Sequence, residues 1–139
     1  MRKNRLVFWL TFGTLAMLLV VPAAAARQAD PGQIAGEWEI ELDAEGEVYY
    51  LAMTLKDEGG KLAGTVSEPS GFFSDIPLTD IFYDGKSFRF KFTAPTPPDG
   101  MERVVAGDFE VENGKMEGFI NVDDLGISAP AVATRKSPL

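Results

Sequence analysis

Residues 85–92 have the sequence Gly-Lys-Ser-Phe-Arg-Phe-Lys-Phe, in which three phenylalanines alternate with polar residues. Such a period of two predicts a strand with one buried and one solvated face. A Gly-Lys pair opens this stretch and two other strand-like stretches, at 60–66 and 114–120. The residues before the three glycines are Gly59, Asp84 and Asn113, which are types that adopt the positive φ angles of two-residue hairpin turns. The repeat therefore predicts consecutive antiparallel hairpins.

The same alternation extends over most of the chain, beginning with Trp38, Ile40 and Leu42 against four acidic residues. We expect strands over 37–43, 48–55, 62–66, 76–83, 88–93, 105–111, 116–122 and 131–136. In the stretch 76–83 the apolar residues switch from even to odd positions midway, which a β-bulge would explain. We expect loops over 94–100, because it holds three prolines, and over 123–130.

The fold class that this pattern predicts is all-β, a single antiparallel up-and-down β-barrel of about eight short strands. Closing the sheet removes the exposed edges that an open sheet would leave. Gly64, Gly107 and Gly118 fall on predicted inner faces, where glycine often marks a bend or a close approach of two backbones. A two-sheet sandwich has the same alternation and is the alternative; the short hairpin connections favour the barrel.

The first 26 residues have the layout of a secretory signal peptide. Arg2, Lys3 and Arg5 precede an apolar run over 6–21, and alanines at 23–26 offer a cleavage site after Ala26. An uncleaved anchor is the alternative, although the apolar run is short for a bilayer span. We therefore expect a periplasmic or secreted protein with a short leader over 27–34 and a barrel domain over 35–139. After cleavage we expect no stable membrane anchor.

Composition narrows the function classes. The chain has no Cys and no His, which excludes disulfides, Ser-His-Asp and Cys-His catalysis and the usual zinc sites. Removing residues 1–26 leaves 10 basic and 21 acidic residues, a net charge of −11, which disfavours nucleic acid as a partner. We expect neither a metal nor another cofactor, and no catalytic residue is assigned. A hydrolase or isomerase would depend on carboxylates alone, among them Asp75, Asp80, Asp84, Asp123 and Asp124.

Three short motifs resemble those of the calycin superfamily, which includes the lipocalins, the fatty-acid-binding proteins and the avidins. They are Gly36-Glu37-Trp38 on the first strand, Gly59-Gly60-Lys61-Leu62 with Gly64 in a hairpin, and Ala133-Thr134-Arg135 near the end. The chain is most similar to small exported bacterial lipocalin-like domains. The resemblance implies that Trp38 is a structural plug at one end of the barrel and that Arg135 covers it.

The aromatic residues on the predicted inner faces are the candidate ligand-binding residues. Tyr49, Phe90 and Phe109 are expected to line an apolar cavity, while Phe72 and Phe73 sit in a loop that caps its mouth or meets a partner. A core filled by the same rings, with the loop pair tucked beneath the loop, is the alternative.

The function predicted from these features is that of a monomeric, exported binding protein for a small apolar or amphipathic ligand. One alternative is a solid-core structural module that binds an extracytoplasmic protein through its loops. The carboxylate-only enzyme is the third hypothesis.

Overall fold

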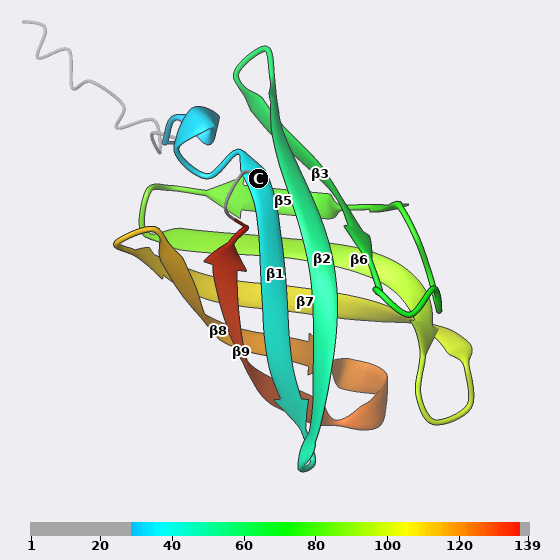
Figure 1. Ribbon diagram of the computed structural model, residues 1–139. Coiled ribbons are helices and arrows are strands. Elements are labelled where there is room, and N and C mark those ends of the chain that lie inside the picture. The colour runs from blue at the N-terminus through cyan, green and yellow to red at the C-terminus, as the bar shows by residue number, and fades with distance from the viewer. Residues whose placement is uncertain (1–28, 137–139) are drawn as a thin grey trace, which may run out of the picture.

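One antiparallel sheet of nine strands forms the molecule and curls into a nearly closed barrel, as the computed structural model shows (Figure 1). The structure describes residues 29–136. The predicted signal peptide over 1–26 and the first residues of the leader therefore lie outside the described residues. The all-β, up-and-down barrel prediction is confirmed, and the sandwich alternative is wrong because all nine strands belong to one continuous sheet.

The elements follow one another in a simple meander. A short 3-10 helix, η1 (Pro31–Gln33), leads into the strands, and a second, η2 (Asp123–Leu125), precedes the last one. The strands are β1 (Gly36–Ala44), β2 (Glu47–Glu58), β3 (Lys61–Ser67), β4 (Ile76–Pro77), β5 (Thr79–Tyr83), β6 (Ser87–Thr96), β7 (Met101–Glu112), β8 (Lys115–Val122) and β9 (Ile127–Arg135).

The Gly-Lys repeats lie at hairpin turns, as predicted. Gly59 and Gly60 join β2 to β3, and Asn113 and Gly114 join β7 to β8, all four with positive φ. These are the two-residue turns whose twist matches that of the flanking strands. The third turn differs, because three residues, 84–86, separate β5 from β6. There the Asp84 carboxylate accepts hydrogen bonds from the backbone N–H groups of Lys86 and Ser87.

The barrel closes where the first strand meets the last. β1 pairs with β2 on one edge and with β9 on the other, with Trp38 opposite Arg135. The sheet order runs β4-β3-β2-β1-β9-β8-β7-β6-β5, so its two ends are strands joined by a single residue, Leu78. The predicted strand 76–83 is thus two strands. The expected irregularity is present as a register shift between Thr79 and Phe82.

Two predicted loops are shorter than expected. β6 continues through Pro95 to Thr96, where the sequence predicted a loop from Ala94. β6 pairs with β5 only as far as Lys91, so beyond Lys91 no strand lies on that side of β6. Pro95, which has no backbone N–H, is tolerated there because no hydrogen bond to β5 is needed. β9 begins at Ile127, not at Ala131, and the loop predicted over 123–130 shrinks to η2 and Gly126.

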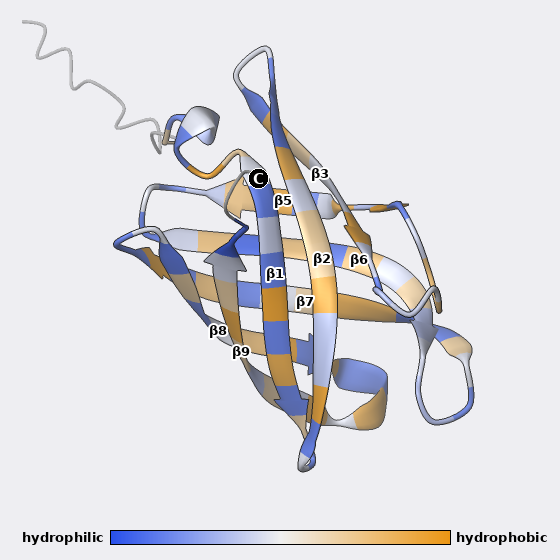
Figure 2. Ribbon diagram, viewed as in Figure 1, coloured by the Kyte–Doolittle hydropathy of each residue, from blue (hydrophilic) through white to orange (hydrophobic). Residues whose placement is uncertain are grey.

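The core lies inside the barrel and follows the predicted alternation. In β1, Trp38, Ile40 and Leu42 are buried while Glu37, Glu39 and Glu41 are exposed, and the strand alternates in hydropathy in Figure 2. A single apolar cluster joins inner-face residues of the strands with Ile34 and Leu78. All the strands therefore contribute to one interior.

Candidate functional site

The two ends of the barrel differ in how they are filled. We call the end at Gly36, where β1 begins, the closed end, and the end at the β1–β2 hairpin the open end. At the closed end, the indole of Trp38 is 0% exposed, and its Nε1 donates a hydrogen bond to the Ile34 carbonyl at 2.9 Å. The guanidinium of Arg135 lies over this ring, 4.6 Å from its centroid, in cation–π geometry.

Arg135 also joins the segment before β1 to the barrel. Its two terminal nitrogens donate hydrogen bonds to the carbonyls of Ala35, at 2.5 Å, and Gln33, at 2.6 Å. Gly36 has a φ of +134°, and a Cβ there would lie 2.9 Å from Arg135 Nη1. The Gly-x-Trp start and the terminal arginine are therefore in direct contact.

Aromatic rings fill the barrel interior next to Trp38. Phe88, Phe90 and Phe109 are almost fully buried, with Phe90 stacked on Phe109 at a centroid separation of 6.0 Å. Phe90 occupies the space that a side chain at position 107 would need, since a Cβ on Gly107 would lie 2.4 Å from its ring. This half of the interior is solid.

The open end holds a cavity of about 510 Å³. Its walls are mainly aliphatic and proline side chains from the inner faces and the rim, and three aromatic residues of its lining come from β2 and β6: Tyr49, Tyr50 and Phe92. The aliphatic and proline lining residues are Leu42, Ala44, Leu51, Pro95, Pro97, Pro98, Val105, Ile120, Val122, Leu125, Ile127 and Ala129. The cavity is therefore apolar inside and open at one end.

The predicted ligand-binding residues fall into two groups. Tyr49, Phe72 and Phe73 line the cavity. Phe90 and Phe109 do not line it, because they stack on each other in the solid half of the barrel. The inner aromatic residues thus form a cavity wall at the open end and a filled core at the closed end.

The two loop phenylalanines point in different directions. Phe73 is half-buried and packs against Phe92 with ring centroids 6.0 Å apart, whereas Phe72 is 50% exposed. The loop that carries them is anchored to its own ends. Glu68 N–H donates to the Phe73 carbonyl at 2.9 Å, and Asp75 N–H donates to Ser67 Oγ at 2.8 Å.

The proline-rich turn between β6 and β7 forms another part of the rim. Arg103 donates two parallel hydrogen bonds to Asp99, at 2.7 and 2.8 Å, and a third to Thr96 Oγ1 at 2.8 Å. The two bonds from Arg103 to Asp99, with that from the Met101 N–H, hold the pKa of the Asp99 carboxyl well below its usual range. The charge of Arg103 is thereby paired within the turn.

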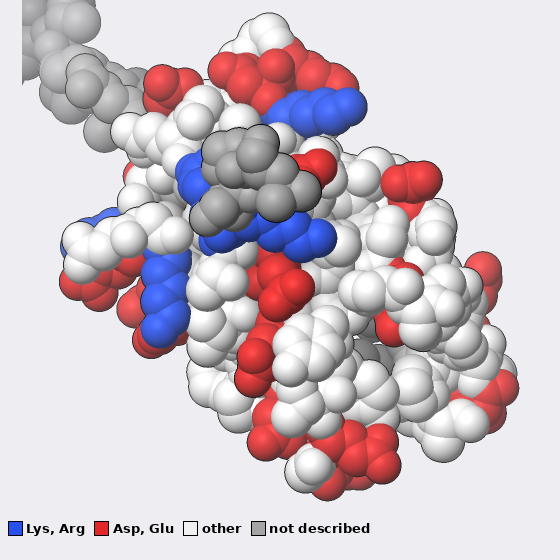
Figure 3. Space-filling view, in the orientation of Figure 1, with Lys and Arg blue, Asp and Glu red and all other residues white. Residues whose placement is uncertain are grey.

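Three glutamates at the mouth of the cavity were not predicted as site residues. Glu45 and Glu47 flank Gly46 in the β1–β2 turn, and Glu68 follows β3; all three belong to the cavity lining. Figure 3 shows a hollow beside the lower part of β2, with red side chains around it and the blue ones in view farther away. The only sequence signal was the acidic composition of the short 44–47 connection.

The aspartates considered for catalysis lie apart from the cavity. Asp75, Asp80, Asp84, Asp123 and Asp124 are exposed, and none of them belongs to its lining. Asp84 is used in a turn, and Asp80 lies 3.8 Å from Lys91 Nζ. Within residues 29–136 no group of three or more acidic side chains is arranged to hold a metal ion.

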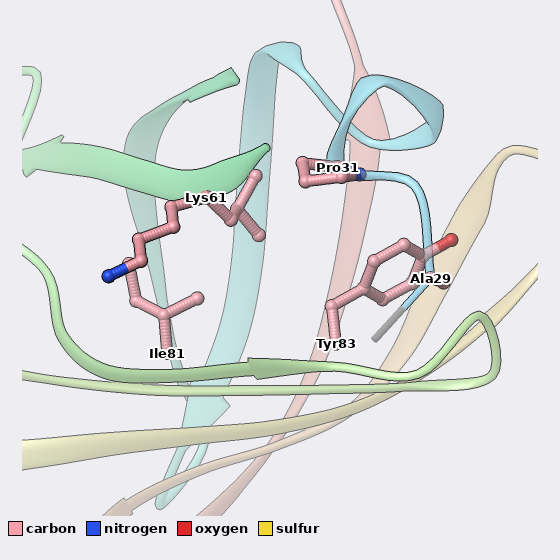
Figure 4. A pocket seen from close by; sticks show the side chains of 6 residues that line it. Ala29, Pro31, Lys61, Ile81 and Tyr83 are labelled. Atoms are coloured by element: carbon pink, nitrogen blue, oxygen red, sulfur yellow. The ribbon is translucent and has the colours of Figure 1, made fainter. Parts of the chain in front are cut away.

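A second, smaller hollow of about 260 Å³ lies at the closed end, in the seam where β3 and β5 are not paired. Lys61 of β3 and Ile81 and Tyr83 of β5 border it beneath Ala29 and Pro31 (Figure 4). The Tyr83 hydroxyl donates to Gln33 Oε1 at 2.9 Å, which ties η1 to this seam. Leu62 completes the lining.

No family model, curated protein or solved structure matches the chain. In the described part of the chain no helix is long and apolar enough to cross a membrane.

Proposed function

We propose that this chain is an exported, lipocalin-like binding protein that holds a small apolar or amphipathic ligand in the open-end cavity. The observation that carries the proposal is the cavity, whose volume of about 510 Å³ lies within the range of small-molecule sites. Its apolar walls provide the hydrophobic contact that drives binding of such ligands. A barrel of this size leaves room for one small ligand.

The contact between Trp38 and Arg135 supports the lipocalin-like part of the proposal, since the resemblance implied this pairing. A ligand would enter and leave through the mouth at the open end, since closely packed rings fill the interior beside Trp38. The protein would work in the periplasm or after secretion, as a monomer and without a cofactor.

Native mass spectrometry tests the proposal on the full-length gene product purified from its own compartment. We expect a second species that is heavier than the protein by the mass of one small molecule and that disappears after organic extraction. The extracted protein should then bind the fluorescent apolar probe N-phenyl-1-naphthylamine. Absence of both the added mass and probe binding would contradict the proposal.

A pair of variants on one strand locates the binding site. Ala129 is buried in the cavity wall, whereas Ser128 is its exposed neighbour on the outer face of β9. Ala129→Phe should project a ring into the cavity and reduce probe binding by about tenfold or more, because part of the space for the probe is lost. Ser128→Phe adds the same ring outside the barrel and should bind normally. Circular dichroism should show a folded barrel for both, and equal binding by both would place the probe elsewhere.

A second candidate function, a protein-interaction module, is favoured by one observation, the half-exposed ring of Phe72 at the mouth. An extracytoplasmic partner would then bind the loop over 68–75 even with the cavity filled. Partner capture that survives Ala129→Phe and is lost in Phe72→Ser would support this function over ligand binding.

A further inference from the structure

The lining of the open-end cavity carries negative charge and no positive charge. Among the described residues that form it, the charged ones are Glu45, Glu47 and Glu68. Arg103, which lies near the rim turn, is engaged by Asp99. The other ion pairs within residues 29–136 join Lys91 to Asp80 and Lys115 to Glu117. The three glutamates at the mouth are thus without a cationic partner in the described part of the chain.

Two of these carboxylates are oriented by neighbours that also line the cavity. The Tyr49 hydroxyl donates a hydrogen bond to Glu47 Oε2 at 2.6 Å. The Ser70 hydroxyl and the Phe72 N–H, the latter at 3.0 Å, donate to Glu68 Oε2. The bonds from Ser70 and Phe72 lower the pKa of Glu68, so this group stays ionised around neutral pH. Each carboxylate retains a second oxygen for a ligand.

Aromatic rings accompany the carboxylates at the same mouth. Tyr49, whose hydroxyl bonds to Glu47, and Phe72, whose N–H bonds to Glu68, both line the cavity, and Phe72 is 50% exposed. Carboxylates next to aromatic faces attract cations of the ammonium type by ion pairing and by cation–π contact. An anionic head group at this position would instead meet three like charges on a protein of strongly negative net charge.

We propose that the ligand is a cationic amphiphile, with an amine or quaternary ammonium head group at the mouth that Glu45, Glu47 and Glu68 make acidic and an apolar body inside the cavity. This inference rests on the proposed function, because it assigns a ligand class to that site. The apolar body would contact Leu51, Phe92 and Ile120 deeper in the barrel. The head group would remain at the mouth, where water still reaches it.

Three probes with the same chain and different head groups test the inference: decyltrimethylammonium, decanol and decanoate. Each is titrated as a competitor of N-phenyl-1-naphthylamine on the extracted protein at low ionic strength, the two ionic probes below their critical micelle concentrations and decanol below its solubility limit. We expect the cation to bind about tenfold more tightly than decanol, and decanoate to bind most weakly. Salt at about 0.5 M should reduce the preference for the cation, because it screens the exposed carboxylates.

A matched pair of double variants separates the mouth from the overall charge. Glu47→Gln with Glu68→Gln should remove the tenfold preference, so that the cation and decanol displace the probe equally well. Glu58→Gln with Glu112→Gln changes the net charge equally at hairpins of the closed end and should leave the preference intact. Both should melt as the parent does.

The outcomes distinguish this inference from the proposed function. If no probe binds, including N-phenyl-1-naphthylamine and decanol, the proposed function itself is wrong. If decanol binds but the cation has no advantage, only the assignment of the head group is overturned. A preference that persists in the Glu47→Gln, Glu68→Gln protein also overturns that assignment.

Discussion

The closed half and the open half of the barrel are built from the same strands yet have opposite interiors. β6 illustrates the difference, because Phe88 and Phe90 are packed in the solid half while Phe92 faces the cavity. On β8, Met116 is fully buried at the closed end, whereas Ile120 and Val122 line the cavity. The alternation along each strand is the same at both ends. The side-chain volumes that meet across the barrel decide which end is filled.

The two halves therefore contribute differently to the protein. The closed half supplies stability through close packing, a buried tryptophan and an arginine bonded to two backbone carbonyls. The open half gives up packing, and its apolar walls remain available to a ligand. A barrel that was solid throughout would be more stable, because no cavity would remain, and it would lack the ligand site that we propose.

The largest effect is expected from Trp38→Ala at the closed end. The substitution removes a fully buried ring, its hydrogen bond to the Ile34 carbonyl and its contact with Arg135. We expect the free energy of unfolding to fall by about 3–5 kcal/mol in urea titrations. At low denaturant the folded fraction should still bind N-phenyl-1-naphthylamine, because the cavity lies at the other end. An unchanged melting curve would show that Trp38 does not stabilise the closed end.

The strands and their inner faces were predictable because alternation is a local property of the sequence. Trp38, Phe88 and Phe109 were all expected to point inward, and all are buried. The end of β6 and the start of β9 were less predictable, since the sequence predicts Pro95 and Pro130 to be loop residues and both lie within strands. Proline blocks only one backbone donor, and whether that donor is needed depends on the neighbouring strand.

The position and the lining of the cavity were not predictable from the sequence, because they depend on the register between strands. Phe90 was expected as a possible cavity wall, but its pairing opposite Gly107 lets it fill the solid half. The position of Glu68 at the mouth likewise follows from the pairing of Ser67 with Ala52 and from the fold of the 68–75 loop. No local pattern in the sequence reports either relation.

A pair of identical substitutions sharpens the comparison between the halves. Val66 is 0% exposed and does not line the cavity, while Val122 is 8% exposed and faces it. Val66→Ala should lower the free energy of unfolding by about 2–3 kcal/mol, because two buried methyl groups are lost and a new void is left. Val122→Ala should cost about 1 kcal/mol or less, because space already exists beside it. Urea titrations of both variants measure the difference, and equal costs would mean that the cavity wall at Val122 is packed as tightly as the interior around Val66.

The smallest expected effect is a change in the pH dependence of stability, and it concerns Arg135 at the closed end and Arg103 at the open end. Arg135 bonds to backbone carbonyls, which do not titrate, whereas Arg103 bonds to the carboxylate of Asp99. The pKa of Asp99 is lowered in the folded protein, so its contribution to stability is complete above the pKa of an unfolded aspartate, about 4. That contribution is lost progressively as the pH falls below this value. Acid should therefore loosen the rim of the open end and leave the Arg135 contacts in place.

We expect Asp99→Asn to be less stable than the parent at neutral pH and to lose less stability between about pH 5 and pH 2. Urea titrations at several pH values measure both slopes. Parallel slopes for the two proteins would show that the Asp99–Arg103 pair does not contribute to the stability of the rim, and the acid-sensitive contrast between the two ends would then be absent.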